Sequence, residues 1–321
     1  MVHYFKALLG FAVIGSLHLS SWAQSEWPKA KPVTLVVAFA PGASSDIVAR
    51  SLTQKLNELT GGNFIVENKG GAGGNIATGQ VKRAAPDGYT ILVHSVAFAV
   101  NPSLYADAGY DALKDFVPVA LGPKTPNIFT VNPSVAAKTL PELVEAAKKA
   151  PFNYASSGIG TTTHLSMERL KTAAKIDIVH VPYKGVGLAL PDMVAGKIQM
   201  VFYPPTFLQF VRDGKLRAIT IAAPARSALL PEVPTTAESG MPELLASSWH
   251  AIVAPAGVPA ENIKKFHAAL TTVMADREVR EKMAGVGADP IGSSPEKFGP
   301  FMRTEVEKWR KVIKSSGITV D

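Results

Sequence analysis

The sequence contains no cysteine, which excludes disulfide bonds, thiolate zinc sites and cysteine nucleophiles. It also lacks a concentrated basic surface, because its 33 lysines and arginines are scattered along the chain against 26 acidic residues. A nucleic-acid surface normally needs a basic stripe with aromatic side chains among it. We therefore expect no nucleic-acid partner, and the modest basic excess fits small anionic ligands.

Catalytic and cofactor motifs are missing as well. The glycine run Gly70–Gly74 does not complete a dinucleotide fingerprint, since Ile76 stands where the third glycine belongs. There is no G-x-S-x-G or H-E-x-x-H motif. His164 and Glu168 lie one helical turn apart, but no third ligand has suitable spacing, so a surface hydrogen bond is favoured over a metal pair. We predict no metal, no cofactor and no enzymatic activity.

The amino terminus has the pattern of a secretory signal peptide. A lysine in Met1–Lys6 precedes the apolar run Ala7–Leu19, and Ser21-Trp22-Ala23 offers small residues for cleavage after Ala23. The alternative is a membrane anchor, but the run is too short to span a bilayer comfortably. Without a cysteine at the cleavage site no lipid is attached. The sequence thus predicts a cleaved, exported protein without a lipid anchor, located in the periplasm of a diderm bacterium.

The length of 321 residues favours two domains, and the pattern along the chain is an alternation of strands and helices. Val33–Phe39 reads as a strand and Asp46–Leu59 as a helix. The rhythm continues past a crossing segment at Val117–Val131, which contains two extended pieces around Gly122-Pro123, and includes a helix over Thr206–Arg212. Two amphipathic helices are expected near the carboxyl terminus. Alternating units of this length predict an α/β protein whose parallel sheets are flanked by helices and whose chain crosses twice between domains.

Two loops in separate halves of the chain share one design. In Val33–Arg50 and in Phe152–Leu170, a strand ends in a glycine-containing loop and a helix begins among small or hydroxyl residues. Backbone N–H groups at a helix N-terminus, together with the helix dipole, hold anions without a basic side chain. The pair therefore predicts a cleft that grips a small anion from both sides.

The chain resembles the tricarboxylate-transporter solute-binding proteins, the Bug or TctC-like family, from Trp27 to Ile318. The resemblance rests on many ordered segments, including AFAPGASSDIVAR (38–50), VENKGGAGGNIA (66–77), AAPDGYTIL (84–92), NYASSGIGTTTHL (153–165), VHVPYKGVG (179–187) and LLPEVPTTAESGMPE (229–243).

This resemblance implies a two-lobe periplasmic-binding-protein fold of type II-like architecture, each lobe a mostly parallel sheet flanked by helices, with two crossover segments. It implies a discontinuous first lobe, residues 25–124 plus 245–321, around a second lobe, residues 125–244, after the signal peptide of residues 1–23. It further implies a receptor, expected to be a monomer, that delivers a mono- or dicarboxylate to a two-subunit membrane permease.

The resemblance also places the binding site on particular residues. The first lobe would contribute two loops and the residues after its third strand: Ala40, Pro41, Gly42, Ala43, Ser44, Asp46, Gly71, Ala72, Gly73, Ser95, Val96 and Ala97. The second lobe would contribute Ser156, Ser157, Thr161, Thr162 and His164. Two departures from the family pattern are Ala43, where a second glycine is common, and Tyr203-Pro204-Pro205, where an acidic or amide residue precedes leucine-proline. The ligand itself stays open.

Several of these residues have a plainer interpretation. Asp46 either orients the first loop or only caps a helix, and Thr161 and Thr162 are also N-cap candidates, although the repeated hydroxyls favour ligand contact. Tyr203 is a pocket wall or a core aromatic, with the pocket slightly favoured. Scattered single histidines are expected to be structural.

Two other functions stay open beside transport. One is a ligand-sensing partner of a membrane histidine kinase, and the other is an enzyme on the same fold, for which the sequence offers no convincing catalytic set.

Overall fold

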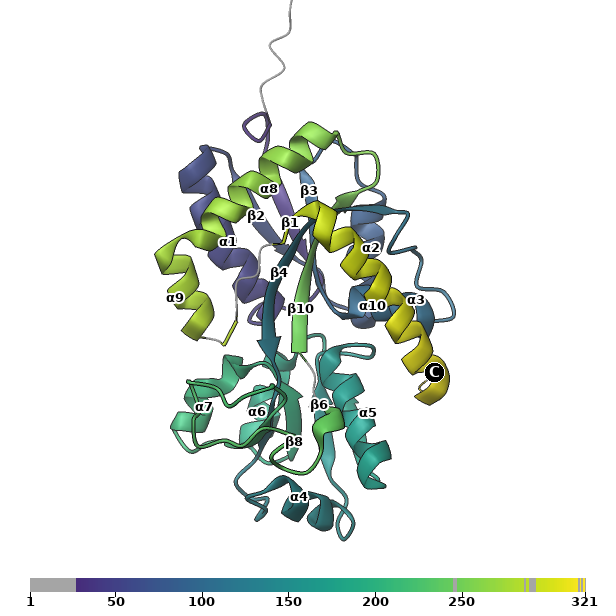
Figure 1. Ribbon diagram of the computed structural model, residues 1–321, viewed down its shortest axis with the longest axis vertical. Coiled ribbons are helices and arrows are strands. Elements are labelled where there is room, and N and C mark those ends of the chain that lie inside the picture. The colour runs from purple at the N-terminus through teal and green to yellow at the C-terminus, as the bar shows by residue number, and fades with distance from the viewer. Residues whose placement is uncertain are drawn as a thin grey trace, which may run out of the picture.

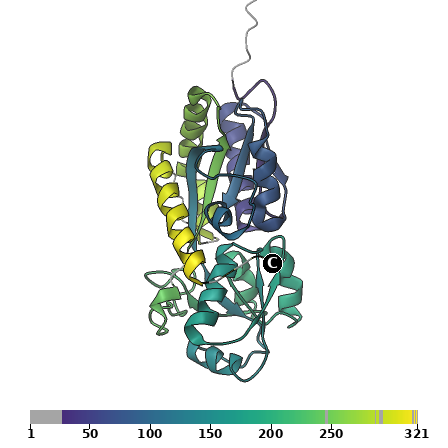
Figure 2. The same cartoon turned by 90° about the vertical axis from the view of Figure 1, so that its right-hand side faces the viewer.

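The computed structural model describes residues 27–244, 247–285, 287–288, 293–316, 318 and 320, and the predicted signal peptide lies outside them. Two lobes lie one above the other, and strands from the first continue into the second (Figure 1). Figure 2 shows the same two bodies from the side, with the long carboxyl-terminal helix lying against the first. Each lobe contains one five-stranded sheet within the described residues.

The first sheet has the strand order β2-β1-β3-β10-β4. Its strands are β1 (Val33–Val37), β2 (Phe64–Asn68), β3 (Thr90–Ser95), β4 (Phe116–Pro126) and β10 (Ser247–Pro255). The second sheet has the order β7-β6-β8-β5-β9. Its strands are β5 (Ile128–Val131), β6 (Asn153–Ser156), β7 (Val179–Pro182), β8 (Met200–Tyr203) and β9 (Arg217–Ile221).

Both sheets are mixed in the same way. β10 runs antiparallel to β3 and β4, and β5 runs antiparallel to β8 and β9, while the other pairings are parallel. The antiparallel strand is in each case the one that has just arrived from the other lobe. The expectation of two α/β lobes crossed twice by the chain is confirmed, whereas the lobe boundaries at 124/125 and 244/245 stay predictions.

Helices cover both faces of the first sheet because its strands are apolar on both sides. Leu35 and Val37 of β1 belong to one buried cluster, and Val36 belongs to the other. The first face is covered by α1 (Ser44–Thr60), α8 (Ala260–Ala275) and α9 (Arg277–Gly285), and the second by α2 (Asn75–Lys82), α3 (Ala97–Leu104) and α10 (Pro295–Ser316). Alternating side chains of a strand point to opposite faces, so a strand buried on both sides reads as a continuous apolar run.

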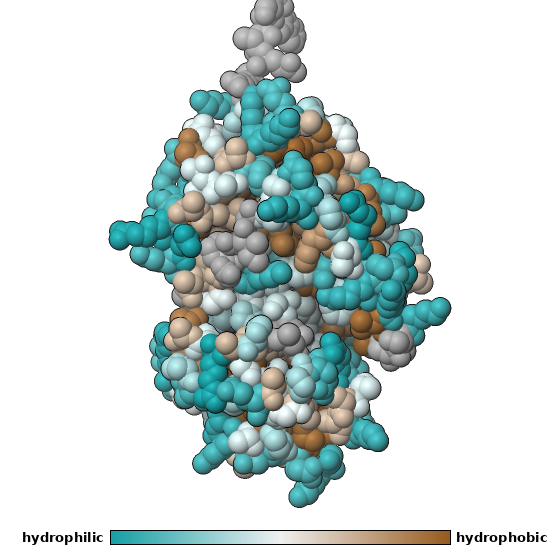
Figure 3. All heavy atoms as spheres, in the orientation of Figure 1, coloured by the Kyte–Doolittle hydropathy of each residue, from teal (hydrophilic) through white to brown (hydrophobic). Residues whose placement is uncertain are grey.

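The second sheet is sandwiched in the same manner. Its helices are α4 (Leu140–Ala147), α5 (Thr162–Ala174), α6 (Leu190–Val194) and α7 (Leu208–Arg212). α4 and α5 pack on one face, around Tyr154 and Phe202, and α6 packs on the other with Tyr203 and Phe207. On the face shown in Figure 3, hydrophilic residues cover much of both lobes, and residues of intermediate hydropathy gather at the waist between them.

Three expectations about the elements need correction. The crossing segment breaks at Asn127 and not at Gly122-Pro123, because β4 continues through both residues. The expected helix over 206–212 is a 3₁₀ turn (Pro205–Phe207) followed by α7. The carboxyl-terminal part described here contains α9 in addition to the two expected helices.

Candidate functional site

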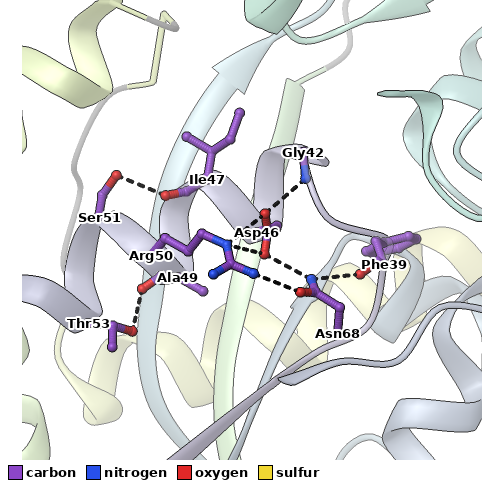
Figure 4. A network of polar contacts seen from close by, with 9 residues as sticks. All are labelled: Phe39, Gly42, Asp46, Ile47, Ala49, Arg50, Ser51, Thr53 and Asn68. Atoms are coloured by element: carbon purple, nitrogen blue, oxygen red, sulfur yellow. Dashed lines mark hydrogen bonds and ion pairs between the residues drawn. The ribbon is translucent and has the colours of Figure 1, made fainter. Parts of the chain in front are cut away.

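A buried carboxylate fixes the loop after β1. Asp46, which is 3% exposed, accepts hydrogen bonds from the Gly42 amide at 2.9 Å and from the Asn68 amide group at 2.9 Å. Arg50, one turn further along α1, donates to both carboxylate oxygens (Figure 4). The N-cap position of α1 is Ala43, so Asp46 acts from the first turn and orients the loop. The Arg50 guanidinium offsets its negative charge, which would otherwise oppose an anion nearby.

Other amides of the same loop reach across to the second lobe. The Ala40 amide donates to the carbonyl oxygen of Lys184 at 2.9 Å, and the Ser44 amide donates to the Tyr203 hydroxyl at 3.1 Å. Pro41 and Gly42 are exposed, and Gly42 adopts a φ of 79°. The first loop therefore already contacts the second lobe, and its Gly42 amide is committed to Asp46.

The loop after β6 is held together by hydroxyl groups. The Thr161 hydroxyl donates to the Gly158 carbonyl at 2.6 Å and lies 2.8 Å from the Thr163 hydroxyl, which accepts from the Ser157 amide. Ser156 accepts from the Gly158 amide. Thr161 stands at the N-cap of α5, but its side chain makes no capping bond. These hydroxyls shape the loop rather than terminate the helix.

Thr162, the first residue of α5, connects this loop to the crossing strands. Its hydroxyl lies 2.6 Å from that of Ser248 on β10, and the Ser248 hydroxyl also donates to the Asn127 side chain. Asn127 is the residue between β4 and β5. These hydrogen bonds join α5 of the second lobe to both segments that cross between the lobes, the β4–β5 junction and the start of β10.

Glycines allow the lobes to approach closely. A Cβ on Gly73 would lie 2.5 Å from the carbonyl oxygen of Ile159, and one on Gly160 would lie 2.4 Å from the side-chain oxygen of Asn101. Real Cβ atoms do not come this near, so only glycine fits either position. Gly73 also has a φ of 60°, in the left-handed region that glycine tolerates. The loop Gly71–Gly73 is thus a contact surface for the second lobe.

Two neighbouring cavities lie where the loops meet. The inner one has a volume of about 20 Å³, room for about one water molecule, and is rich in hydroxyl groups. Its lining consists of Phe39, Ala43, Ser44, Ser45, Ser95, Ser157, Thr161, Thr162, Thr163, Tyr203 and Ser248. The outer one has a volume of about 180 Å³ and is lined by Phe39, Gly71, Ala72, Gly73, Gly74, Tyr105, Ser157, Gly158, Ile159, Pro182, Tyr183 and Lys184.

The structure brings most of the sequence-predicted residues to these cavities and leaves some apart. Ala43, Ser44, Ser95, Ser157, Thr161, Thr162 and Tyr203 line the inner cavity, and Gly71, Ala72 and Gly73 line the outer one. Ala40, Pro41, Gly42, Asp46, Val96, Ala97, Ser156 and His164 line neither. Val96 is part of a hydrophobic core cluster.

Some lining residues were not predicted. Ser45, Thr163 and Ser248 add hydroxyl groups to the inner cavity, Phe39 lines both cavities, and Lys184 brings a cation to the outer one. The hydroxyl of Ser45 is buried and has no hydrogen-bond partner among the described residues. The S-S pair at Ser44-Ser45 and the T-T-T run were visible signals, but Ser248 is remote in sequence from both loops.

Behind the second loop, three rings form a stack. His164 and His180 lie 4.4 Å apart between centroids, and His180 lies 4.8 Å from Tyr154. Burial lowers the pKa of His164 to about 4, and burial together with His164 lowers the pKa of His180 to about 3. Both imidazoles are therefore neutral at neutral pH and supply no positive charge to a ligand.

His94 and His250 are neutral for the same reason. Burial lowers the pKa of His94 to about 3 and that of His250 to about 4. His250 lies 3.0 Å from the Pro123 carbonyl through Nδ1 and 3.3 Å from the Ser44 hydroxyl through Nε2. Burial raises the pKa of Tyr203, which keeps it a neutral phenol. Among the described residues no group of three potential ligands could hold a metal ion, and no helix of this part is long and apolar enough to cross a membrane.

Residues 48–318 match the family model described as the tripartite tricarboxylate transporter family receptor. The chain belongs to this family. A curated member of similar sequence is the protein BugT of Bordetella pertussis, which is 34% identical over 295 residues, 90% of each chain. The recognised resemblance is confirmed by both comparisons.

Solved structures agree with the family assignment. The periplasmic binding protein BugD is 33% identical with a TM-score of 0.87, covering 90% of this chain and 99% of that one. A protein of R. palustris solved with adipate is 32% identical with a TM-score of 0.87, covering 92% and 99%. MatC of Rhodopseudomonas palustris, solved with bound malate, is 31% identical with a TM-score of 0.83, covering 88% and 99%. These neighbours confirm the two-lobe α/β fold of periplasmic binding proteins.

Proposed function

We propose that this receptor works in the periplasm, as a monomer, and captures a small mono- or dicarboxylate between its lobes for delivery to a two-subunit membrane permease. Two observations support the ligand class. Relatives with the same fold were solved with adipate and with malate. The interlobe cavity of this chain concentrates hydroxyl groups and the N-termini of two helices, α1 and α5, as a carboxylate requires.

The single observation that carries the proposal is the Ser45 hydroxyl. It lines the inner cavity in the first turn of α1, is buried, and lacks a partner among the described residues. A buried polar group without a hydrogen bond is costly, so such a group in a cavity marks a place for a ligand atom. In this proposal a ligand carboxylate accepts from Ser45 and from the first-turn amides of α1 and α5.

The remaining predicted residues then act at different distances from the ligand. Ser95, Ser157, Thr161 and Thr162 offer hydroxyls in the inner cavity, and the loop Gly71–Gly73 encloses the rest of the ligand from the outer one. Asp46, Ser156 and His164 shape the loops from behind through Gly42, Gly158 and Gly160. The inner cavity of about 20 Å³ is smaller than a carboxylic acid, so the lobes must separate to admit one.

A thermal-shift screen of organic acids, including adipate and malate, tests the proposal. An acid present at a hundred times its dissociation constant should stabilise the protein by about 2.7 kcal/mol. Calorimetry on the parent and on Ser45→Ala then locates the site, and uptake of the same acid by cells with and without the receptor tests delivery. If no carboxylate raises the melting temperature, or if Ser45→Ala binds the acid as tightly as the parent, the proposed site is wrong.

A further inference from the structure

A second concave site lies outside the interlobe cavity, between α5 of the second lobe and α10 of the first. It has a volume of about 460 Å³, within the range typical of small-molecule sites. Both cartoon views show α10 reaching from the first lobe toward the second (Figures 1 and 2). We call this site the α5–α10 groove, and its lining consists of Lys124, Thr162, Leu165, Ser166, Arg169, Ser247, Trp249, Phe301, Glu305, Lys308, Trp309 and Val312.

Three aromatic rings form the apolar part of the groove. Trp249 packs edge-on against Phe301 with centroids 5.2 Å apart, and Trp309 stands one turn beyond Glu305 on α10. Trp249 is 3% exposed, whereas Phe301 and Trp309 are half-buried. Partly exposed rings in a concavity offer a surface for stacking a flat ligand.

The charges around these rings favour an anion. The groove has three cations, Lys124, Arg169 and Lys308, and one carboxylate, Glu305. That carboxylate is buried and already accepts from the indoles of Trp249 and Trp309, each at 3.1 Å, and from Lys308. It is therefore not available to a ligand.

Two of the cations are not neutralised by acidic side chains. Within the described residues the Arg169 side chain has no hydrogen bond or ion pair. The Lys124 ammonium lies over the ring of Phe301, 5.3 Å from its centroid, without an acidic partner. Arginine and lysine at the edge of an aromatic surface match a molecule with one carboxylate and one flat apolar body.

We propose that the α5–α10 groove is a second ligand site, separate from the interlobe cavity, for an aromatic monocarboxylate. Its carboxylate is held by Arg169 and Lys124, and its ring packs on Phe301 and Trp309. Because the groove is built from both lobes, a ligand there also stabilises the closed arrangement. Thr162 is part of the wall of both sites, and its hydroxyl lies 2.6 Å from that of Ser248.

Tryptophan fluorescence with benzoate as the probe tests this proposal, because two of the four tryptophans line the groove. We expect saturable quenching in the parent and about tenfold weaker binding in Arg169→Ala and in Lys124→Ala. Lys114→Ala, which removes a lysine whose side chain is 84% exposed elsewhere on the first lobe, is the matched control and should bind as the parent does. Benzyl alcohol, which lacks the charge, should bind more weakly than benzoate.

A variant that fills the interlobe cavities distinguishes the two sites. Ser157 lines both the inner and the outer cavity but not the groove, so Ser157→Leu should retain benzoate binding. Circular dichroism establishes that each variant is folded. Loss of benzoate binding in folded Ser157→Leu with no effect of Arg169→Ala and Lys124→Ala would place the probe between the lobes and overturn the proposal. Absence of saturable binding to the parent would overturn it as well, without bearing on the interlobe site.

Discussion

The backbone amide of Ser44 in the first lobe donates a hydrogen bond to the hydroxyl oxygen of Tyr203 in the second, over 3.1 Å. This amide lies in the first turn of α1, where a ligand carboxylate is proposed to bind. The phenol oxygen is bonded to an amide that the proposal assigns to the ligand, and the bond joins the two lobes. Tyr203 also lines the inner cavity, so it is a candidate for setting which acids enter.

Tyr203→Phe should strengthen binding of the best acid found by screening. Removing the hydroxyl frees the Ser44 amide, and a neutral hydrogen bond contributes roughly 0.5–1.5 kcal/mol, which corresponds to about a twofold to tenfold lower dissociation constant. Isothermal titration calorimetry measures the change. Tyr110→Phe is the matched control, because that hydroxyl bonds the Phe98 carbonyl inside the first lobe. Weaker binding in Tyr203→Phe would mean that the hydroxyl contacts the ligand and does not compete with it.

Gly73→Ala should prevent full closure. The added Cβ would meet the Ile159 carbonyl at 2.5 Å across the lobes, so ligand binding should be lost and the radius of gyration by small-angle scattering should not decrease with ligand. Gly109→Ala controls for backbone strain, because Gly109 has a similar φ of 76° but no atom within 4 Å of the new Cβ. Equal affinity in the two variants would argue against the close approach of the lobes seen here.

Asp46→Ala should loosen the first loop. It removes the acceptor of the Gly42 amide, of Asn68 and of Arg50, and we expect a loss of about 2 kcal/mol in the free energy of unfolding by urea. The ion pair with Arg50 adds little to this loss of stability, because the Arg50 side chain is 55% exposed and solvent partly screens the pair. Glu58→Ala at the far end of α1, where the carboxylate pairs with Lys55, should cost much less. A loss no larger than that of Glu58→Ala would contradict the role given to Asp46.

Lys184→Ala should distinguish dicarboxylates from monocarboxylates. Lys184 is the cation of the outer cavity, whereas the inner cavity has none among its lining residues. A second ligand carboxylate would lie near Lys184, so the variant should weaken a dicarboxylate and leave a monocarboxylate of equal length unchanged. Lys175→Ala at the carboxyl end of α5 is the control. The variant keeps the carbonyl oxygen that accepts from the Ala40 amide, so no effect on either acid would indicate that Lys184 acts only through its backbone. Equal weakening of both acids would also contradict the prediction.

Acid should destabilise the protein through its buried histidines. The pKa values of His94 and His180 are lowered to about 3, and those of His164 and His250 to about 4, against 6.5 in an unfolded chain. Between these limits the unfolded state binds more protons, so the stability present above pH 6.5 is lost as the pH falls toward 4. Each of the three buried histidines, His94, His164 and His250, contributes about 1.4 kcal/mol per pH unit in this window, and the half-buried His180 contributes less because solvent screens its charge. Urea unfolding at pH 7.5 and 5.5 measures the loss, and His180→Asn should reduce the slope. A slope unchanged by His180→Asn would contradict the lowered pKa of that ring.

Local sequence patterns predicted the alternation of strands and helices because periodicity and glycine turns act over a few residues. α1 was expected at Asp46–Leu59 and spans Ser44–Thr60. α9 was missed because few of its residues are apolar, and only Val279 and Met283 enter the core cluster. The break in the crossing segment was misplaced since Gly122-Pro123 resembles a turn. In the sheet, a register shift of β10 near His250 accommodates Gly122 and Pro123 within β4. The His250 ring lies against the Pro123 carbonyl.

The site was predictable where one segment carries several polar groups, as in Ser44 and Thr161-Thr162. It was not predictable where groups meet through the fold. Ser248 comes to Thr162 across 86 positions, and Lys184 meets Ala40 through its backbone, which no side-chain pattern reports. The commitment of the Gly42 amide to Asp46 also depends on how the loop curls back on its own helix.

The two crossings between the lobes are neighbours in one ladder, because β4 and β10 pair down to Thr125↔Ser248 and Pro126↔Ser247. A paired ribbon bends across its plane more readily than its strands slide along each other, since sliding breaks the ladder bonds. The lobes should therefore open by hinge bending of this two-stranded ribbon. A solute should then enter and leave on the side away from the β4–β10 ribbon, where the loops of Ala40 and Lys184 meet.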